Sequence, residues 1–457
     1  MGALLVLPGC GRKERARPAV SPQVSAAVAA ARSSCASANI VIVCVDAARR
    51  DHIGCYGYDR PTTPEIDKIA AQGIRFETPV TDASYTHSAI ASLWTGQYPD
   101  THGFATVQWR LPLKVTTLPE ACRATGMRTA VISSSGAVVK PFGFADGVDD
   151  FMSLLRPSPG TGQIPDLQQA WGKWLDGIGS QRFFLYVHLM PPHHPYEWSG
   201  PFRGKFDPDY RGRIRSTQQI LFDLDAGKTR VTERDREHII AMYDEALRYS
   251  DWAVGRLVDD LRKRGLLDKT LLIVLSDHGE GFGEHGRWLH RNTVYNELTH
   301  NFIVMRLPAG VKGARKQVPG LAQLCDLAPT LATLTGFKLP SGQIQGRDLA
   351  SQIFGGPVTR EAAFSRSVEG SLRSVEIRGA KGIFDWQGRL LELYDLTSDP
   401  AEKTNIVGKR PRLQAHIIAA FQAWAARQEH MRPPGRPSPM PQLNPETKKW
   451  LRSLGYL

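Results

Sequence analysis

The sequence predicts an α/β fold: a mainly parallel sheet sandwiched by helices, with a smaller C-terminal α+β subdomain. Three apolar runs rich in β-forming residues, at 39–45, 183–187 and 270–275, are typical of buried strands. Segments with helical periodicity separate them, and this alternation favours parallel strands joined by helical crossovers. At 457 residues the chain is long enough for one large α/β domain and a smaller one.

The helices between these strands follow in order. Thr63 as cap and Pro64 at the first helical position predict a helix that begins there. Residues 118–126 predict a helix ended by glycine, followed by a strand at 129–132. Residues 232–264 carry an apolar stripe at helical spacing, which predicts one long amphipathic helix before the third strand.

The pattern changes after about residue 360. Short strand-like pieces at 371–378, 380–385 and 390–394 precede a helical pattern at 411–428, and together they predict the smaller subdomain. The predicted division is a terminal segment at 1–38, a sheet domain at 39–358, and a subdomain with a tail at 359–457.

The net charge of +12 lies at the two ends of the chain. Residues 1–38 carry +4 and residues 405–457 carry +7, which leaves +1 for the body. A nucleic-acid-binding protein needs a basic face on its folded domain, so this distribution argues against nucleic acid as a partner. No apolar run is long enough to span a membrane.

The first residues resemble the end of a bacterial lipoprotein signal. Residues 3–7 are apolar, and small residues then lead to Cys10, which would become the lipidated first residue. Residues 11–38, rich in Arg, Ala, Ser and Pro, have the composition of a tether. We expect an exported protein, periplasmic or anchored to a membrane through Cys10; the alternative is a cytoplasmic protein.

Acids and imidazoles follow the three apolar strands. Asp46 comes directly after the first, His188 after the second, and Asp277 with His278 after the third. The carboxyl ends of parallel strands share one edge of a sheet, where ligands bind. Each residue alone could be a turn or cap residue, but three together predict one site suited to a metal or to acid–base chemistry.

Many ordered motifs resemble the sulfatase branch of the alkaline phosphatase superfamily. The resemblance covers most of the body and implies the fold of that superfamily and hydrolysis of sulfate or phosphate esters. The motifs that carry it are Cys55–Tyr58, Arg60–Pro64, Leu93–Pro99, His102–Gly103, Ser276–Glu280, Gly283–Gly286, Asp326–Thr330, Leu393–Leu396, Asp399–Pro400 and Leu451–Tyr456.

The resemblance places the nucleophile at Thr86, ten residues before Gly96. Sulfatases proper have Cys or Ser there, within a Cys/Ser-x-Pro-x-Arg pattern that is converted to formylglycine. This chain has Ser88 in place of the Pro and Ile90 in place of the Arg. Since threonine is not a substrate for that conversion, a direct threonine alkoxide is expected. Residues 88–95 predict a helix whose positive end lies near Thr86; the alternative is that Thr86 only caps this helix.

The resemblance also implies a metal set made of Asp46, Thr86, Asp277 and His278. Sulfatases often have a second Asp after the first, where this chain has Ala47. That departure leaves a site for one divalent ion, with zinc or manganese favoured over calcium. Relatives often read Asp-Pro-His where this chain has Pro191-Pro192-His193, so a second ion is not expected.

Two histidines are candidates to act on the substrate. His290 falls where many sulfatases keep a catalytic lysine, and His193 is the second candidate; either would bind the oxyanion or protonate the leaving group. His188, His194 and His285 are expected to be loop histidines satisfied by backbone bonds.

The predicted function is a metal-dependent ester hydrolase that acts on an anionic sulfated or phosphorylated glycan, lipid or small molecule. Phosphate esters and phosphonates are expected to be favoured over sulfate esters. One alternative is a phosphoryl transferase with a lipid or glycan acceptor, and another is a non-catalytic relative that binds an anionic ligand. Residues 196–230 are expected to form a lid.

Overall fold

The computed structural model describes residues 20–431, except 105–109, 113–114, 156–162, 198–199 and 291, together with positions 445 and 448. The predicted lipoprotein signal at Cys10 lies outside these residues. Among the helices described, none is both long and apolar enough to cross a membrane.

The described residues form a central sheet of eight strands in the order β4-β3-β5-β1-β6-β7-β2-β8. Only β7 runs antiparallel to its neighbours, so the predicted parallel sheet is confirmed. The strands are β1 (Asn39–Val45), β2 (Ile74–Pro79), β3 (Arg128–Ser133), β4 (Asp150–Ser153), β5 (Phe183–Leu189), β6 (Thr270–Leu275), β7 (Ile303–Arg306) and β8 (Gln317–Ala322).

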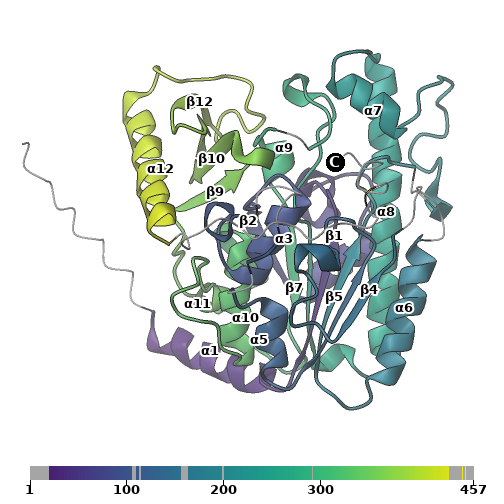
Figure 1. Cartoon of the computed structure of the whole chain (residues 1–457), viewed down its shortest axis with the longest axis vertical. Coiled ribbons are helices and arrows are strands. Elements are labelled where there is room, and N and C mark those ends of the chain that lie inside the picture. The colour runs from purple at the N-terminus through teal and green to yellow at the C-terminus, as the bar shows by residue number, and fades with distance from the viewer. Residues whose placement is uncertain are drawn as a thin grey trace, which may run out of the picture.

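Helices cover both faces of this sheet (Figure 1). In β1, Ile40, Ile42 and Cys44 pack on one side, and the alternate valines pack on the other. The first face is covered by α1 (Pro22–Cys35), α3 (Thr86–Thr95), α5 (Leu118–Arg123), α10 (Leu327–Thr335) and α11 (Ala350–Ile353). The second face is covered by α2 (Pro64–Gln72), α6 (Gln163–Gly177) and α8 (Glu233–Lys263). Three short helices lie in connections: α4 (Pro99–His102), α7 (Gln218–Asp225) and α9 (Asn296–Thr299).

The cap of α2 differs from the prediction. Thr63 occupies the capping position, but its hydroxyl accepts from the backbone N–H of Gly54 at 2.8 Å. The carboxylate of Asp251, on α8, instead accepts from the backbone N–H groups of Glu65 and Ile66 at 2.8–3.1 Å. A residue distant in sequence therefore satisfies this helix end and ties α8 to α2.

The predicted tether is wrong over residues 22–35, which form α1. Ser21 caps this helix, Pro22 opens it, and its Ala31 and Cys35 are buried against α10 and α11. The alanines that suggested a flexible segment are also strong helix formers, and here their small side chains let α1 pack closely on the domain.

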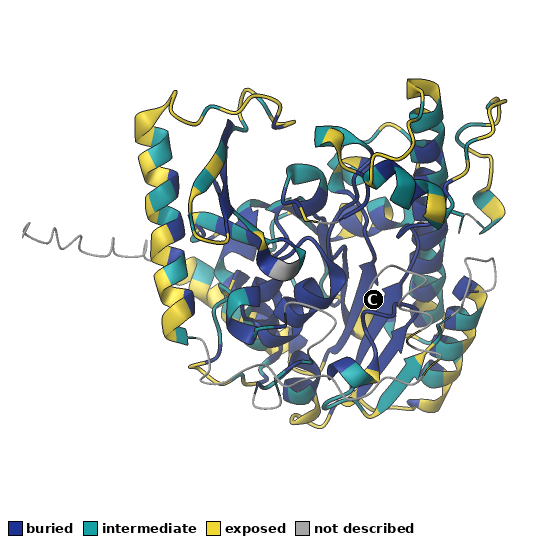
Figure 2. Ribbon diagram, turned by 45° about the horizontal axis from the view of Figure 1, so that its top comes forward, coloured by how far each residue is buried: buried dark blue, intermediate teal, exposed yellow. Residues whose placement is uncertain are grey.

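The C-terminal part of the described chain forms the predicted α+β subdomain. Its antiparallel sheet has the order β12-β11-β10-β9, and α12 (Pro411–Met431) packs on it through Ile417, Phe421 and Trp424. Figure 2 shows the central strands wholly buried and α12 exposed along its outer side. The strands are β9 (Ala362–Arg366), which the sequence reading missed, β10 (Leu372–Ile377), β11 (Ala380–Asp385) and β12 (Leu390–Asp395).

A histidine links the two parts of the molecule. His285 Nδ1 lies 2.9 Å from Glu297 Oε1, and His285 Nε2 lies 3.1 Å from the carbonyl oxygen of Glu402. Burial alone would lower the pKa of His285, but the hydrogen bond and charge of Glu297 outweigh it and raise the pKa to about 9.

We predict that His285→Gln destabilises the protein at pH 6 and has little effect at pH 9.5. A folded-state pKa above the unfolded value near 6.5 means that the stabilisation is complete below about pH 6.5 and is lost as the pH rises through about 9. Because solvent screens this partly exposed pair, the loss at pH 6 is about 0.5–1 kcal/mol. Urea unfolding at both pH values measures it, with His430→Gln, an exposed histidine, as control. Equal losses at pH 6 and 9.5 would contradict the assignment.

Candidate active site

Two carboxylates lie at the carboxyl edge of the central sheet. Asp46 follows β1 and Asp277 follows β6, and these two strands are paired in parallel with Cys44 opposite Leu275. The pairing of β1 with β5 extends to Asp46, because the backbone N–H of Asp46 donates to the carbonyl oxygen of Leu189, the last residue of β5. The strand register therefore fixes both acids next to each other, and both are fully buried.

Thr86 is the first residue of α3. Its Oγ1 lies 3.1 Å from His278 Nε2 and 3.4 Å from Asp46 Oδ1. The capping position is Tyr85, so Thr86 does not serve as the cap that was considered from the sequence. The first turn of a helix leaves N–H groups unused and carries partial positive charge, so this hydroxyl sits where an anion is stabilised.

The two carboxylate oxygens of Asp277 differ in their hydrogen bonding. Its Oδ1 accepts from the backbone N–H groups of Ala47 at 3.1 Å and His278 at 3.0 Å. Its Oδ2 is buried and has no hydrogen-bond partner among the described residues, and His278 Nε2 lies 3.5 Å away. A buried carboxylate oxygen without a partner is costly unless a cation satisfies it.

Asp46, Asp277 and His278 fit a divalent ion. Each offers one ligand atom, and these atoms lie within 4.8 Å of one another. Burial and the charge of Asp277 raise the pKa of Asp46. Burial alone would lower the pKa of His278, but Asp277 and Asp46 raise it. Two carboxylates and an imidazole, held close and dehydrated, are a donor set that zinc or manganese accepts.

His188 belongs to this site, contrary to its prediction as a loop histidine. It lies within β5, where its Nε2 is 2.9 Å from Asp46 Oδ2 and its Nδ1 is 2.7 Å from the hydroxyl of Tyr186. Ser135, after β3, donates to the same Asp46 oxygen at 3.3 Å. The Tyr-x-His spacing, which places both side chains on one face of a strand, was the signal available in the sequence.

The other predicted histidines separate into two groups. His290 lies beside His278, with ring centroids 4.4 Å apart, and His193 and His194 lie beside His290 at 4.8 Å and 5.3 Å. His285 lies apart from them, bonded to Glu297 and Glu402 as described above. Burial lowers the pKa of His290 to about 4, and burial together with His194 and His290 lowers the pKa of His193. Both imidazoles are therefore neutral at pH 7.

Glu280 holds His290 in place, and the sequence reading did not identify it. Its Oε1 lies 2.9 Å from His290 Nδ1. Burial alone would raise the pKa of Glu280, but His290 and His194 lower it, so Glu280 is ionised. A buried carboxylate bound to an imidazole fixes the orientation of the ring and its tautomer.

The α/β fold brings a hydroxyl, two carboxylates and several imidazoles together at this edge of the sheet, and these groups form a candidate hydrolytic site. Comparison with known proteins narrows the class: the family model described as Sulfatase matches residues 38–337. The chain therefore belongs to the Sulfatase family, and it is a sulfuric or phosphoric ester hydrolase of that family.

Relatives and solved structures agree with this assignment. The chain is 23% identical to N-acetylglucosamine-6-O-sulfatase of Bacteroides thetaiotaomicron, over 81% of this chain and 83% of that protein. It is 30% identical to arylsulfatase K of Rattus norvegicus, over 77% of this chain and 71% of that protein. Its fold matches the phosphonate monoester hydrolase of Agrobacterium radiobacter with a TM-score of 0.71 and 20% identity, over 86% of this chain and 96% of that one.

We predict that Asp46→Asn stabilises the chelator-treated protein while it abolishes activity. Removing one of two adjacent buried carboxylates relieves repulsion and dehydration, with an expected gain of about 1–2 kcal/mol in the free energy of unfolding. Denaturant unfolding in a chelator measures it. Asp209→Asn, whose side chain is 91% exposed, is the matched control and is expected to change stability by less than about 0.5 kcal/mol. A chelator-treated Asp46→Asn protein less stable than wild type would contradict the repulsion.

Proposed function

We propose that this chain hydrolyses phosphate esters or phosphonates faster than sulfate esters, with Thr86 as the nucleophile and one divalent ion at Asp46, Thr86, Asp277 and His278. The observation that carries the proposal is the position of Thr86 Oγ1, which lies 3.1 Å from His278 Nε2 and 3.4 Å from Asp46 Oδ1. This position is where a formylglycine precursor stands in sulfatases proper, and threonine cannot take that route.

The residues around Thr86 prepare its hydroxyl for attack. A divalent ion bound here supplies charge that lowers the pKa of the hydroxyl and offsets charge on the transferred group. Asp46 Oδ1 is an acceptor for the Thr86 proton, and Tyr186, through His188, orients the carboxylate of Asp46. The N–H groups in the first turn of α3, which lack partners within the helix, are proposed to hold the oxyanion.

His193 and His290 are proposed to act on the transferred group or the leaving alcohol, either directly or by holding a cation beside it. His290 is held by Glu280 and adjoins His278. This arrangement supports a role beyond that of loop histidines, as does their burial.

The preference for phosphorus follows from the chemistry of the enzyme ester. A formylglycine hydrate releases sulfate by elimination, whereas a threonine sulfate needs a second displacement at sulfur. A threonine phosphate is released more readily when charge and an imidazole assist departure. The threonine at position 86 therefore favours phosphoryl over sulfuryl turnover.

The substrate is proposed to be an anionic ester on a glycan, lipid or small molecule. The names of the relatives support both chemistries under consideration, transfer of a sulfuryl group and transfer at phosphorus, since they include an N-acetylglucosamine-6-O-sulfatase and a phosphonate monoester hydrolase. Export and a lipid anchor at Cys10 stay predictions of the sequence.

We predict that Thr86→Ala lowers kcat by at least about 1,000-fold while the melting temperature changes little, because the variant lacks the nucleophile. Thr86→Ser is the matched control: it keeps a hydroxyl and is expected to retain activity within about 10-fold. Ser88 and Ile90 break the formylglycine pattern, so serine at position 86 would not be converted. A Thr86→Ala protein with a tenth of wild-type activity would remove Thr86 from the mechanism.

We predict that kcat/KM for 4-nitrophenyl phosphate esters, or for the corresponding phosphonate, exceeds that for 4-nitrophenyl sulfate by at least about 10-fold, a difference of about 1.4 kcal/mol in activation free energy. The measurement uses one protein preparation with saturating zinc, manganese or calcium in parallel. A clear preference for sulfate under all three ions would overturn the proposed substrate class and leave the family assignment intact.

A further inference from the structure

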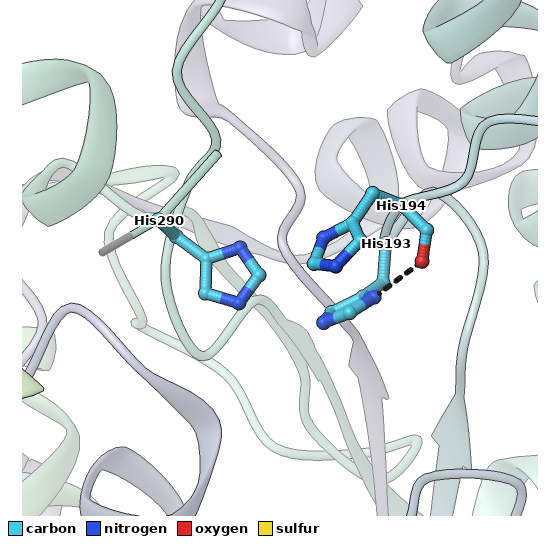
Figure 3. A group of neighbouring side chains, drawn as sticks. All are labelled: His193, His194 and His290. Atoms are coloured by element: carbon cyan, nitrogen blue, oxygen red, sulfur yellow. Dashed lines mark hydrogen bonds between the residues drawn. The ribbon is translucent and has the colours of Figure 1, made fainter. Parts of the chain in front are cut away.

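We propose that His193, His194 and His290 form a second metal site, suited to zinc or a similar transition-metal ion, beside the site at Asp46, Asp277 and His278. One ligand atom from each of the three histidines lies within 4.8 Å of the other two. Figure 3 shows the rings of His193 and His194 turned toward His290 across a common space. The sequence reading did not expect a second ion here.

The three histidines come from two segments and are withdrawn from water. His193 and His194 lie in the connection after β5, and His290 lies in the connection after β6. Their exposed fractions are 0%, 2% and 5%. Three dehydrated imidazoles at one point are unusual without a ligand, because each ring holds two polar atoms that need partners.

Hydrogen bonds fix which nitrogen carries the proton in two of these rings. His193 Nδ1 lies 2.8 Å from the carbonyl oxygen of His194, which can only accept, so that nitrogen is a donor (Figure 3). His290 Nδ1 lies 2.9 Å from Oε1 of the Glu280 carboxylate, so it too is a donor. Each neutral ring then carries its lone pair on Nε2. A carboxylate or carbonyl behind a histidine is the usual support of a metal-binding imidazole.

His194 supplies the independent observation. Neither of its ring nitrogens has a hydrogen-bond partner among the described residues, although the side chain is 98% buried. Its Nδ1 lies 3.6 Å from Glu280 Oε2, which also lacks a hydrogen-bond partner there. A small approach of Nδ1 to Glu280 would give His194 the same support as His290 and leave its Nε2 for an ion.

This proton arrangement favours a cation over a substrate oxyanion. An oxyanion needs N–H donors, whereas the Nε2 atoms of His193 and His290 carry lone pairs. Burial of both rings opposes the positive charge that a second proton would add. A transition-metal ion takes imidazoles as ligands and would also give His194 a partner.

The second site adjoins the first through His278 and His290, whose ring centroids are 4.4 Å apart. Two adjacent ions can stabilise both the attacking and the leaving oxygen in phosphoryl transfer. This consequence for catalysis rests on the proposed function, whereas binding of the ion does not. Phe222, on α7 within the lid predicted at 196–230, packs on His194 with ring centroids 5.7 Å apart.

Metal titration tests the inference. Full-length protein stripped with a chelator is titrated with Zn²⁺ by calorimetry, and metal content after dialysis is measured by elemental analysis. We expect two equivalents in wild type. His194→Gln and His290→Gln are each expected to lose one equivalent, with affinity lowered by more than about 100-fold, beyond the effect of an outer-shell change. Asp277→Ala/His278→Ala is expected to lose the other equivalent. His238→Gln is the matched control. His238 lies on α8 and pairs with Asp207, outside both clusters.

The outcomes separate this inference from the proposed function. One equivalent in wild type, retained in His194→Gln and lost in Asp277→Ala/His278→Ala, would overturn the second site and leave the first. Two equivalents with none lost in Asp277→Ala/His278→Ala would overturn the first site. The wild-type stoichiometry does not depend on the folding of any variant, and Co²⁺ in place of Zn²⁺ reports each site through its visible absorption.

Discussion

The repulsion between two buried carboxylates is the constraint around which this edge of the molecule is built. Because β1 pairs with β6 in parallel register, Asp46 and Asp277 cannot move apart without breaking the sheet. Unscreened like charges in a protein interior are costly. The surroundings offset that cost: the N–H of Ala47 turns toward Asp277 in a backbone conformation with φ +56°, and His188 and His278 face Asp46.

Charge divides the site into two halves. One half, around Asp46 and Asp277, is rich in carboxylate oxygen and lies beneath the start of α3. The other half, around His193, His194 and His290, is rich in imidazole nitrogen and contains the carboxylate of Glu280. His278 contacts both halves: its Nε2 lies 3.1 Å from Thr86 Oγ1, and its ring lies beside the ring of His290. An anionic group held near His278 would contact the carboxylate half and the imidazole half together. Such an arrangement suits in-line displacement at a tetrahedral centre.

The sequence predicted the parts of this site that depend on periodicity and missed the parts that depend on contact across the sheet. Asp46, Asp277 and the long helix α8 were predictable because apolar strands and an amphipathic stripe leave strong patterns. Thr86 was predicted through the family resemblance. His188 was placed at the sheet edge but was then interpreted as a loop histidine, because the strand before it was taken to end at Val187, one residue short of the histidine. That boundary decides whether a side chain belongs to the sheet edge or to a loop.

Glu280 and Asp251 show a second kind of limit. Each is an acid whose role is set by a partner brought close only by folding: His290 for Glu280, and the start of α2 for Asp251. Local sequence favoured Thr63 as the cap of α2 and gave no reason to single out Glu280. The tether prediction failed for a related reason, because composition does not reveal the surface of α10 on which α1 packs.

Every residue of α3 is buried, and this has a consequence for how the enzyme can change. The helix ends at Gly96 in a left-handed conformation, where an added Cβ would lie 2.9 Å from Ile344. Thr86 therefore lies on a buried helix that tolerates few substitutions anywhere along its length. Adaptation to new substrates, in nature or in the laboratory, is therefore confined to the connections that surround the site. Mutant libraries that vary α7 and the segment before it should contain a high fraction of folded variants. Libraries that vary α3 should contain a low fraction.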